Sequence, residues 1–222
     1  MKKPFLFLLP VFLLACQSLP AMNPAGQERF ACPSPFPKEP SRWVHSIESR
    51  MPGHQRSSVI GITAIEPATQ TVSCAVMTPE GVVLFEAEDG PQGLQVKRAL
   101  PPFDLSDVAK NMIADIRMIF LAPPGALEGK GFLPNGAAAC RYRDEKGEWT
   151  DVVREGPTDN VQIRRYSPAG VLKRQVRLRD KKKNFYQRVE LQADEIYPYS
   201  LEMKLLDVRL LNKPPKHSKN IN

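Results

Sequence analysis

The sequence lacks the motifs by which most enzyme classes are recognised. It has only three histidines, and none of them has metal-ligand spacing to a cysteine or a carboxylate. It contains no G-x-S-x-G nucleophile elbow, no phosphate-binding glycine loop and no H-E-x-x-H zinc motif. Glu86, Glu88 and Asp89 cluster, but carboxylates on the polar face of a strand are usually solvated rather than catalytic. We therefore expect no catalytic residue, no metal site and no cofactor.

Long apolar runs are also scarce, and the clearest one lies at the N-terminus. Residues 5–15 are apolar except for Pro10 and follow Lys2 and Lys3. The run is too short to span a bilayer as a helix, and a positive start before a short apolar run is typical of a secretory signal. The sequence therefore predicts a signal peptide over residues 1–15.

The end of this signal, Leu13-Leu14-Ala15-Cys16, is similar to the lipobox of bacterial lipoproteins. The resemblance implies that Cys16 becomes the acylated first residue of the mature chain, held in the membrane by its acyl chains. Gln17 stands where an inner-membrane-retaining aspartate would stand, which implies the outer membrane, with the protein facing the periplasm. The alternative is a cysteine that follows the signal by chance.

Three further cysteines remain once Cys16 is set aside. An extra-cytoplasmic location permits disulfides, and three cysteines allow at most one bridge within a chain. The sequence leaves all three pairings of Cys32, Cys74 and Cys140 open. Cys74 shares a strand face with Val72 and Val76, where a buried free thiol would behave as a small apolar side chain.

The segment after Cys16 is rich in proline and poor in periodic hydrophobicity. Ser18 to Pro40 contains six prolines, and we interpret residues 16–40 as an acylated cysteine with an extended tether. At roughly 3.1 Å per residue, the tether would reach about 60–70 Å. Residues 42–51 place Trp43, Val44 and Ile47 at helical spacing, which predicts a short amphipathic helix.

Beyond this point, alternating apolar and polar residues predict a series of short strands. The expected strands are residues 58–66, 69–78, 82–88, 94–100, 137–143, 148–154, 160–166, 171–179, 185–193 and 200–211. One apolar helix is expected over residues 104–121, with Asp104 as its N-cap. Residues 122–136, with three prolines and four glycines, are expected to form a long loop.

This order of elements predicts one mainly β domain over residues 41–212, followed by a polar tail over residues 213–222. Evenly spaced strands favour a barrel or a sandwich over βαβ units, and a single apolar helix among them must cover one face of the sheet. The expected fold is an antiparallel, incomplete (half-open) β-barrel with a long apolar helix packed in or over its mouth.

This arrangement resembles the LolA/LolB-like lipoprotein-carrier superfamily and, within it, the small bacterial lipoproteins of the DUF3261 family. The resemblance depends on Cys16, the turn at residues 77–81, the strands at 83–85 and 94–96, and the helix over 109–121. Phe120-Leu121 departs from the Trp-Pro that the family often has near the end of this helix. The resemblance implies a hydrophobic cavity that accepts a lipid or a lipoprotein acyl chain.

The residues expected to line such a cavity come from the sheet and from the helix. They are Val83, Phe85, Leu94, Val96, Val108, Met112, Ile116, Ile119 and Phe120. The same apolar stripe would also suit an ordinary solid core. In that case, the chain would be a non-catalytic interaction lipoprotein, a tethered subunit that contacts an envelope protein.

A strongly basic hairpin is the other unusual feature. Its cationic residues are Lys173, Arg174, Arg177, Arg179, Lys181, Lys182, Lys183 and Arg188. They could contact anionic lipid head groups, each contributing about 1 kcal/mol near a charged surface. They could equally form a solvated edge that discourages strand pairing. We do not expect nucleic acid as a partner of a secreted, membrane-anchored chain.

Overall fold

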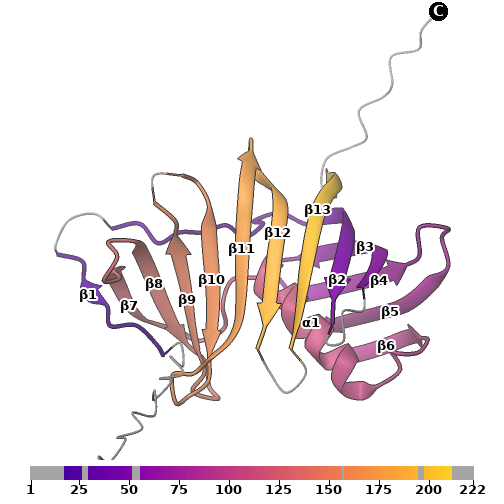
Figure 1. Ribbon diagram of the computed structural model, residues 1–222, viewed down its shortest axis with the longest axis horizontal. Helices are drawn as coiled ribbons and strands as arrows, with labels where there is room; N and C mark the ends of the chain where they lie inside the picture. The colour runs from indigo at the N-terminus through magenta and orange to yellow at the C-terminus, as the bar shows by residue number, and fades with distance from the viewer. Residues whose placement is uncertain (1–17, 27–29, 52–55, 157, 195–197, 212–222) are drawn as a thin grey trace, which may run out of the picture.

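In the computed structural model, the described residues are 18–26, 30–51, 56–156, 158–194 and 198–211. Within them, thirteen strands form one antiparallel sheet that curls around a single helix (Figure 1). The sheet is open, and its order is β1-β7-β8-β9-β10-β11-β12-β13-β2-β3-β4-β5-β6. The elements are β1 (Asn23–Pro24), β2 (Ser41–Arg50), β3 (Arg56–Glu66), β4 (Thr71–Met77), β5 (Val83–Gly90), β6 (Gly93–Ala99), α1 (Ser106–Phe120), β7 (Ala126–Phe132), β8 (Ala138–Arg143), β9 (Trp149–Arg154), β10 (Val161–Tyr166), β11 (Leu172–Lys182), β12 (Phe185–Ala193) and β13 (Tyr199–Leu210).

The predicted fold class is confirmed as a mainly antiparallel, open β-sheet with one helix. Most strands expected after residue 57 are present within a few residues of the expected bounds. Their buried and exposed side chains alternate, as in β4, where Val72, Cys74 and Val76 are buried and their neighbours are not. Such period-two burial is what an amphipathic strand requires.

The predicted helix over residues 42–51 is wrong, because this segment is strand β2 in the middle of the sheet. β2 pairs along its whole length with β13 on one side and β3 on the other. Ser41, Trp43 and His45 point into the core. The apolar Val44 on the other face produced the helix-like spacing with Trp43 and Ile47.

Two further sequence expectations fail around the helix. The predicted N-cap, Asp104, lies outside α1; Leu105 occupies the cap position and makes no side-chain capping hydrogen bond. The predicted loop over residues 122–136 contains strand β7, which pairs with β8 and with β1. Glycine is required at one position of β7 because the backbone of β1 passes close to it. A Cβ at Gly131 would lie 2.0 Å from the carbonyl oxygen of Asn23.

The segment expected to be a free tether lies against the sheet instead. We call residues 18–26 and 30–40 the strap. At its start, Ser18 forms a β-bridge with Val171, and the Leu19 amide donates to the Gly170 carbonyl at 2.7 Å. The Arg141 guanidinium then donates to the Pro20 carbonyl at 2.9 Å. These contacts hold the beginning of the strap on the turn between β10 and β11 and across neighbouring strands.

The strap continues around the β7 edge of the sheet to the opposite face. Met22 packs with Leu133 and Val153 on one face of the sheet. Phe36 packs on the opposite face, against the apolar cluster that contains Trp43 and Phe120. Between these points, β1 pairs with Gly131 and Phe132, so the strap covers the end of this edge strand. A disulfide joins Cys32 to Cys140 and settles the pairing that the sequence left open. The predicted free, buried thiol of Cys74 is confirmed.

Two apolar clusters fill the face that α1 covers, which we call the inner face. The larger cluster lies between the C-terminal end of α1, β2 and the strands from β9 to β13, with Trp43, Phe120, Ile163, Val176 and Leu191 among its members. The smaller cluster lies between β4, β5 and the N-terminal half of α1. Ile116 packs against both clusters.

Candidate ligand-binding face

The N-terminal half of α1 covers the smaller cluster through two buried side chains. Ala109 and Ile113 pack against Cys74, Val76, Phe85 and Ala87 of β4 and β5. Met112 and Phe103 are only half-buried at the margin of this contact. Leu105, immediately before the helix, is 60% exposed. This half of the helix therefore meets the sheet through a narrow apolar contact.

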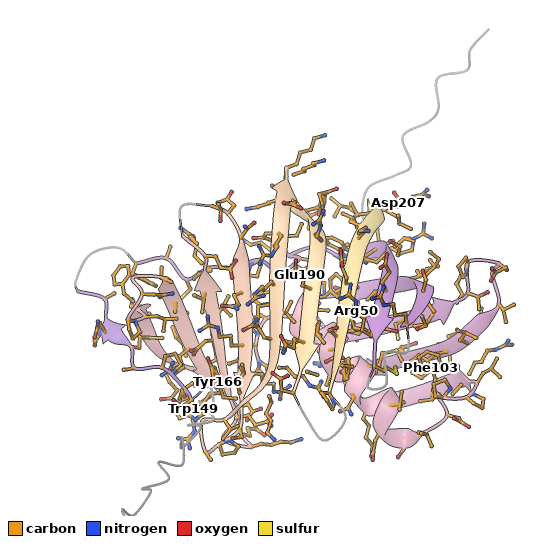
Figure 2. The ribbon with its side chains drawn as sticks, viewed as in Figure 1. Arg50, Phe103, Trp149, Tyr166, Glu190 and Asp207 are labelled. Carbon is orange, nitrogen blue, oxygen red and sulfur yellow. A yellow bond between two sulfur atoms is a disulfide. The ribbon has the colours of Figure 1, made fainter. Side chains whose placement is uncertain are left out.

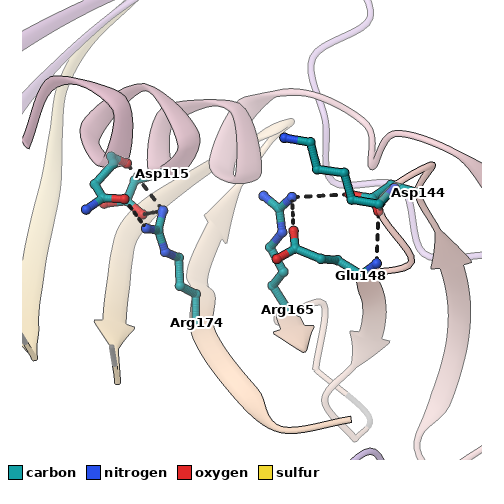
Figure 3. A network of polar contacts seen from close by, with 7 residues as sticks. Asp115, Asp144, Glu148, Arg165 and Arg174 are labelled. Carbon is teal, nitrogen blue, oxygen red and sulfur yellow. Dashed lines mark hydrogen bonds and ion pairs between the residues drawn. The ribbon is translucent and has the colours of Figure 1, made fainter. Parts of the chain in front are cut away.

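The middle of α1 is fixed to the sheet by a buried ion pair (Figure 3). The Arg174 guanidinium of β11 donates to the Asp115 carboxylate at 2.7 Å and to the Asn111 side-chain oxygen at 2.8 Å. The Tyr199 hydroxyl of β13 donates to the other carboxylate oxygen of Asp115. Arg174 and Asp115 are both about 4% exposed. Two buried charges are tolerated only when they are paired and hydrogen-bonded, so this contact fixes the helix position.

A second polar link holds the next turn of the helix. The Arg117 guanidinium donates to the Asp89 carboxylate at 2.8 Å and to the Gln70 carbonyl at 2.9 Å. Met118, Ile119, Phe120 and Leu121 then bury the end of the helix in the larger cluster. The C-terminal half of α1 is therefore held by two ion pairs and by packing. The N-terminal half is held by the small apolar contact and by the hydrogen bond from Arg174 to Asn111.

The structure divides the nine predicted cavity residues between different environments. Phe85, Leu94, Met112 and Ile116 meet in the smaller cluster, whereas Ile119 and Phe120 lie in the larger one. The remaining residues belong to neither cluster: Val83 and Val108 are half-buried, and Val96 is 46% exposed. Side chains from the sheet and from α1 fill the inner face between them.

Among the pockets of the described surface, two shallow ones are lined mainly by charged and polar residues. One, of about 200 Å³, is lined by residues of β2, β11, β12 and β13 that include Glu48, Arg50 and Glu190. The other, of about 450 Å³, lies beside the tip of the β11–β12 hairpin and is lined by Asp180, Arg188 and Lys204 with their neighbours. Neither of these two pockets is lined by α1.

The basic hairpin is less free than its sequence indicates. The prediction that Arg174 contacts head groups is wrong, because Arg174 is buried against α1. Four of the other cations form ion pairs: Arg177 with Glu155, Arg179 with Glu190, Lys181 with Asp159, and Arg188 with Asp180. Lys182 and Lys183 at the tip are exposed.

His45, which the sequence patterns did not single out, lies in the larger cluster. Its ring stacks on Trp43 with 6.2 Å between centroids and lies 5.9 Å from the Phe120 ring. The side chain is 2% exposed, and its Nδ1 has no hydrogen-bond partner. Burial lowers the pKa of His45 to about 4. The alternation of Ser41, Trp43 and His45 could have revealed it, had the segment been interpreted as a strand.

Some predicted features lie outside the described residues, among them the signal peptide, Cys16 and the tail over 213–222. Within the described residues, no helix is long and apolar enough to cross a membrane. The same residues present no group of three or more His, Cys, Asp and Glu side chains that could hold a metal ion.

The structure is similar to the crystal structure of a LolA superfamily protein from Nitrosomonas europaea, with a TM-score of 0.54 and 12% sequence identity. The match covers 81% of this chain and 89% of the other. At this identity, the likeness concerns the fold. No family model matches the chain, and no curated protein matches it.

Proposed function

We propose that this protein is an outer-membrane-anchored lipoprotein that binds or transfers a lipidic ligand on its inner face, without catalysing a reaction. The observation that carries the proposal is the unequal attachment of α1. Its C-terminal half is held by the Asp115–Arg174 and Arg117–Asp89 pairs, and its N-terminal half covers an apolar cluster through Ala109 and Ile113. The LolA-like fold supports the same interpretation.

In this proposal, the N-terminal half of α1 acts as a lid over the smaller cluster, and opening it breaks the hydrogen bond from Arg174 to Asn111. Lifting it would expose Phe85 and Ala87 of the sheet and Met112 and Ile113 of the helix to an acyl chain. Each methylene that the chain buries would contribute about 0.8 kcal/mol, which offsets the apolar packing that the lifted helix gives up. The flexible Met112 side chain suits a surface that must adapt to a mobile chain.

The test is binding of an environment-sensitive fatty-acid probe to the protein lacking residues 1–16. Wild type should bind the probe, and Ile116→Trp should block binding, because the larger indole would occupy the place at the junction of the two clusters that an acyl chain has to enter. Leu105→Trp is the matched control: it adds the same side chain at the exposed start of the helix and should leave probe binding unchanged. Absence of probe binding by wild type, together with strong destabilisation by Ile116→Trp, would overturn the carrier function.

The anchor is part of the same proposal and has its own test. Leu13-Leu14-Ala15-Cys16 supports acylation of Cys16. Replacing Cys16 with Ser should release the chain from the membrane fraction, and mass spectrometry of the wild type should find an acylated N-terminal peptide. Identical fractionation of the two chains, with an unmodified N-terminal peptide, would exclude the anchor.

A second candidate is an interaction lipoprotein with a solid interior. Its specific support is the filled inner face together with the exposed Lys182 and Lys183 at the hairpin tip. The probe experiment separates the two candidates. A protein that binds no probe and loses stability on Ile116→Trp would be assigned to this second class.

A further inference from the structure

The start of the strap fixes where a lipid anchor can lie. Ser18 bridges to Val171, and the Leu19 amide donates to Gly170, so the strap begins on the β10–β11 turn. Cys16 is two residues before Ser18, and two extended residues span at most about 7 Å. Acyl chains on Cys16 would therefore begin within this distance of the β10–β11 end of the sheet.

We propose that this end of the molecule is a membrane-apposed edge, seated on the surface of the same bilayer that holds the acyl chains. The membrane-apposed edge comprises the β8–β9 turn, the β10–β11 turn and the N-terminal end of α1, all at the lower side of Figure 1. Figure 2 places Trp149, Tyr166 and Phe103 along it, and Asp207 at the opposite side. The inference depends on the proposed acylation of Cys16 and adds an orientation to it.

Exposed apolar side chains also lie at the membrane-apposed edge. Val171 follows the β10–β11 turn, Leu127 lies near the start of β7 beside the β8–β9 end, and Leu105 precedes α1. All three are large, apolar and exposed. A bilayer interface would bury them, since apolar area gains free energy when it leaves water. The opposite side also exposes Phe132, Leu206 and Leu211, so the position of Cys16 carries the assignment and the apolar side chains are compatible with it.

The same geometry turns the basic hairpin away from the anchoring membrane. β11 runs from the β10–β11 turn to the hairpin tip, and its 11 residues separate the two ends. At about 3.3 Å per residue, the tip lies on the order of 35 Å from the anchored end. Surface charges act over a Debye length of about 8–10 Å in physiological salt. Lys181, Lys182 and Lys183 therefore face the aqueous compartment, not the head groups beside the anchor.

Tryptophan quenching in vesicles tests this orientation with the full acylated chain. The vesicles contain neutral lipid and a lipid with a nitroxide on its head group. The chain has two tryptophans, the buried Trp43 and Trp149 at the membrane-apposed edge. Trp43→Phe isolates Trp149, whose emission should be lost in these vesicles. A second variant, Trp43→Phe with Trp149→Phe and Asn184→Trp, moves the reporter to the exposed hairpin tip, and its emission should remain.

Equal quenching at both positions, or stronger quenching at Asn184→Trp, would overturn the orientation. If Trp43→Phe does not fold, the quenching of wild type is compared with that of Trp149→Phe, and the quenched fraction should disappear with Trp149. Failure of the anchor is distinguished by flotation. A wild-type chain that does not float with vesicles, and carries no acyl mass, excludes the anchor and the orientation together. A chain that floats but is quenched at the tip excludes the orientation alone.

Discussion

His45 shows how a single residue acquires unusual chemistry from the fold around it. The imidazole lies between Trp43 and Phe120, and its Nδ1 finds no polar partner. In this apolar site the charged form is disfavoured, so the pKa of His45 falls to about 4 from the ordinary value of 6.5. The folded protein therefore holds a neutral histidine at neutral pH.

We expect His45 to make the protein less stable in acid. The folded pKa is the lower one, so between pH 6.5 and pH 4 the unfolded chain binds the extra proton and unfolding is favoured. The full pKa shift corresponds to about 3 kcal/mol in the free energy of unfolding, and this stability is lost as the pH falls through this window. Urea titrations at pH 7 and at pH 4.5 should show this loss for wild type. His45→Phe, which keeps an aromatic ring beside Trp43, should show a smaller loss; an equal loss would assign the acid sensitivity to other groups.

The buried thiol of Cys74 leads to a second prediction about a single residue, which concerns its reactivity. Burial against β5 raises the pKa of the Cys74 thiol to about 12, so almost no thiolate exists at neutral pH. Because the thiolate is the reactive form, Cys74 should resist alkylation by iodoacetamide in the folded protein. Mass spectrometry should find this residue unmodified in buffer and fully modified in denaturant. Rapid modification of the folded chain would mean that β4 opens often.

At the scale of elements, the buried pair between α1 and β11 is the contact that the sequence could not predict. Arg174 belongs to a run of cations, and only its contact with Asp115 of α1 distinguishes it from the others. Asp115 lies 59 residues earlier in the chain, so no local pattern reveals the contact. Strand alternation identified most of the sheet because it is a local pattern. The errors at β2 and β7 arose where a segment has apolar residues on both faces, or glycines that only a neighbouring backbone explains.

We predict that removing one partner of the Arg174–Asp115 pair destabilises the fold much more than removing both. Arg174→Met leaves the Asp115 charge buried and should reduce the free energy of unfolding by about 3–5 kcal/mol. The double variant Arg174→Met, Asp115→Leu should recover most of that loss. Arg177→Met, on the same strand, is the control. Its half-exposed pair with Glu155 should contribute at most about 1 kcal/mol. Equal losses for Arg174→Met and Arg177→Met, measured by urea denaturation, would contradict the assigned role.

For the whole molecule, the strap changes the domain that the sequence predicts. Prolines without periodic hydrophobicity favoured a free tether, and nothing local in the strap shows that it contacts the sheet. Its attachment depends on residues far away in the chain, Cys140, Gly170 and Val171. Such long-range contacts leave no periodic pattern along the sequence. The domain therefore begins near Ser18 in the described structure, not at residue 41.

The disulfide that holds the strap should account for a measurable part of the stability. Cys32 and Cys140 are 108 residues apart. A bridge closing so long a loop is expected to contribute about 2–5 kcal/mol. Replacing both cysteines with serine should lower the urea midpoint accordingly in the protein lacking residues 1–16. Cys74→Ala, which removes a thiol without a bridge, serves as the control. An unchanged midpoint in the double variant would mean that packing of Phe36 and pairing of β1 hold the strap alone.

The strap also decides how copies of this chain can associate. In the described sheet, β1 covers Gly131 and Phe132 at the end of β7, and β6 is the terminal strand on the other side. Because the strap covers part of β7, β6 is the more open edge, and β6 against β6 is a two-fold pairing that ends with two chains. Lys97 and Arg98 on β6 discourage even this pairing. A chain whose strap is displaced would expose the whole length of β7 as a second edge, and head-to-tail addition of further copies into a growing fibre would then be geometrically allowed.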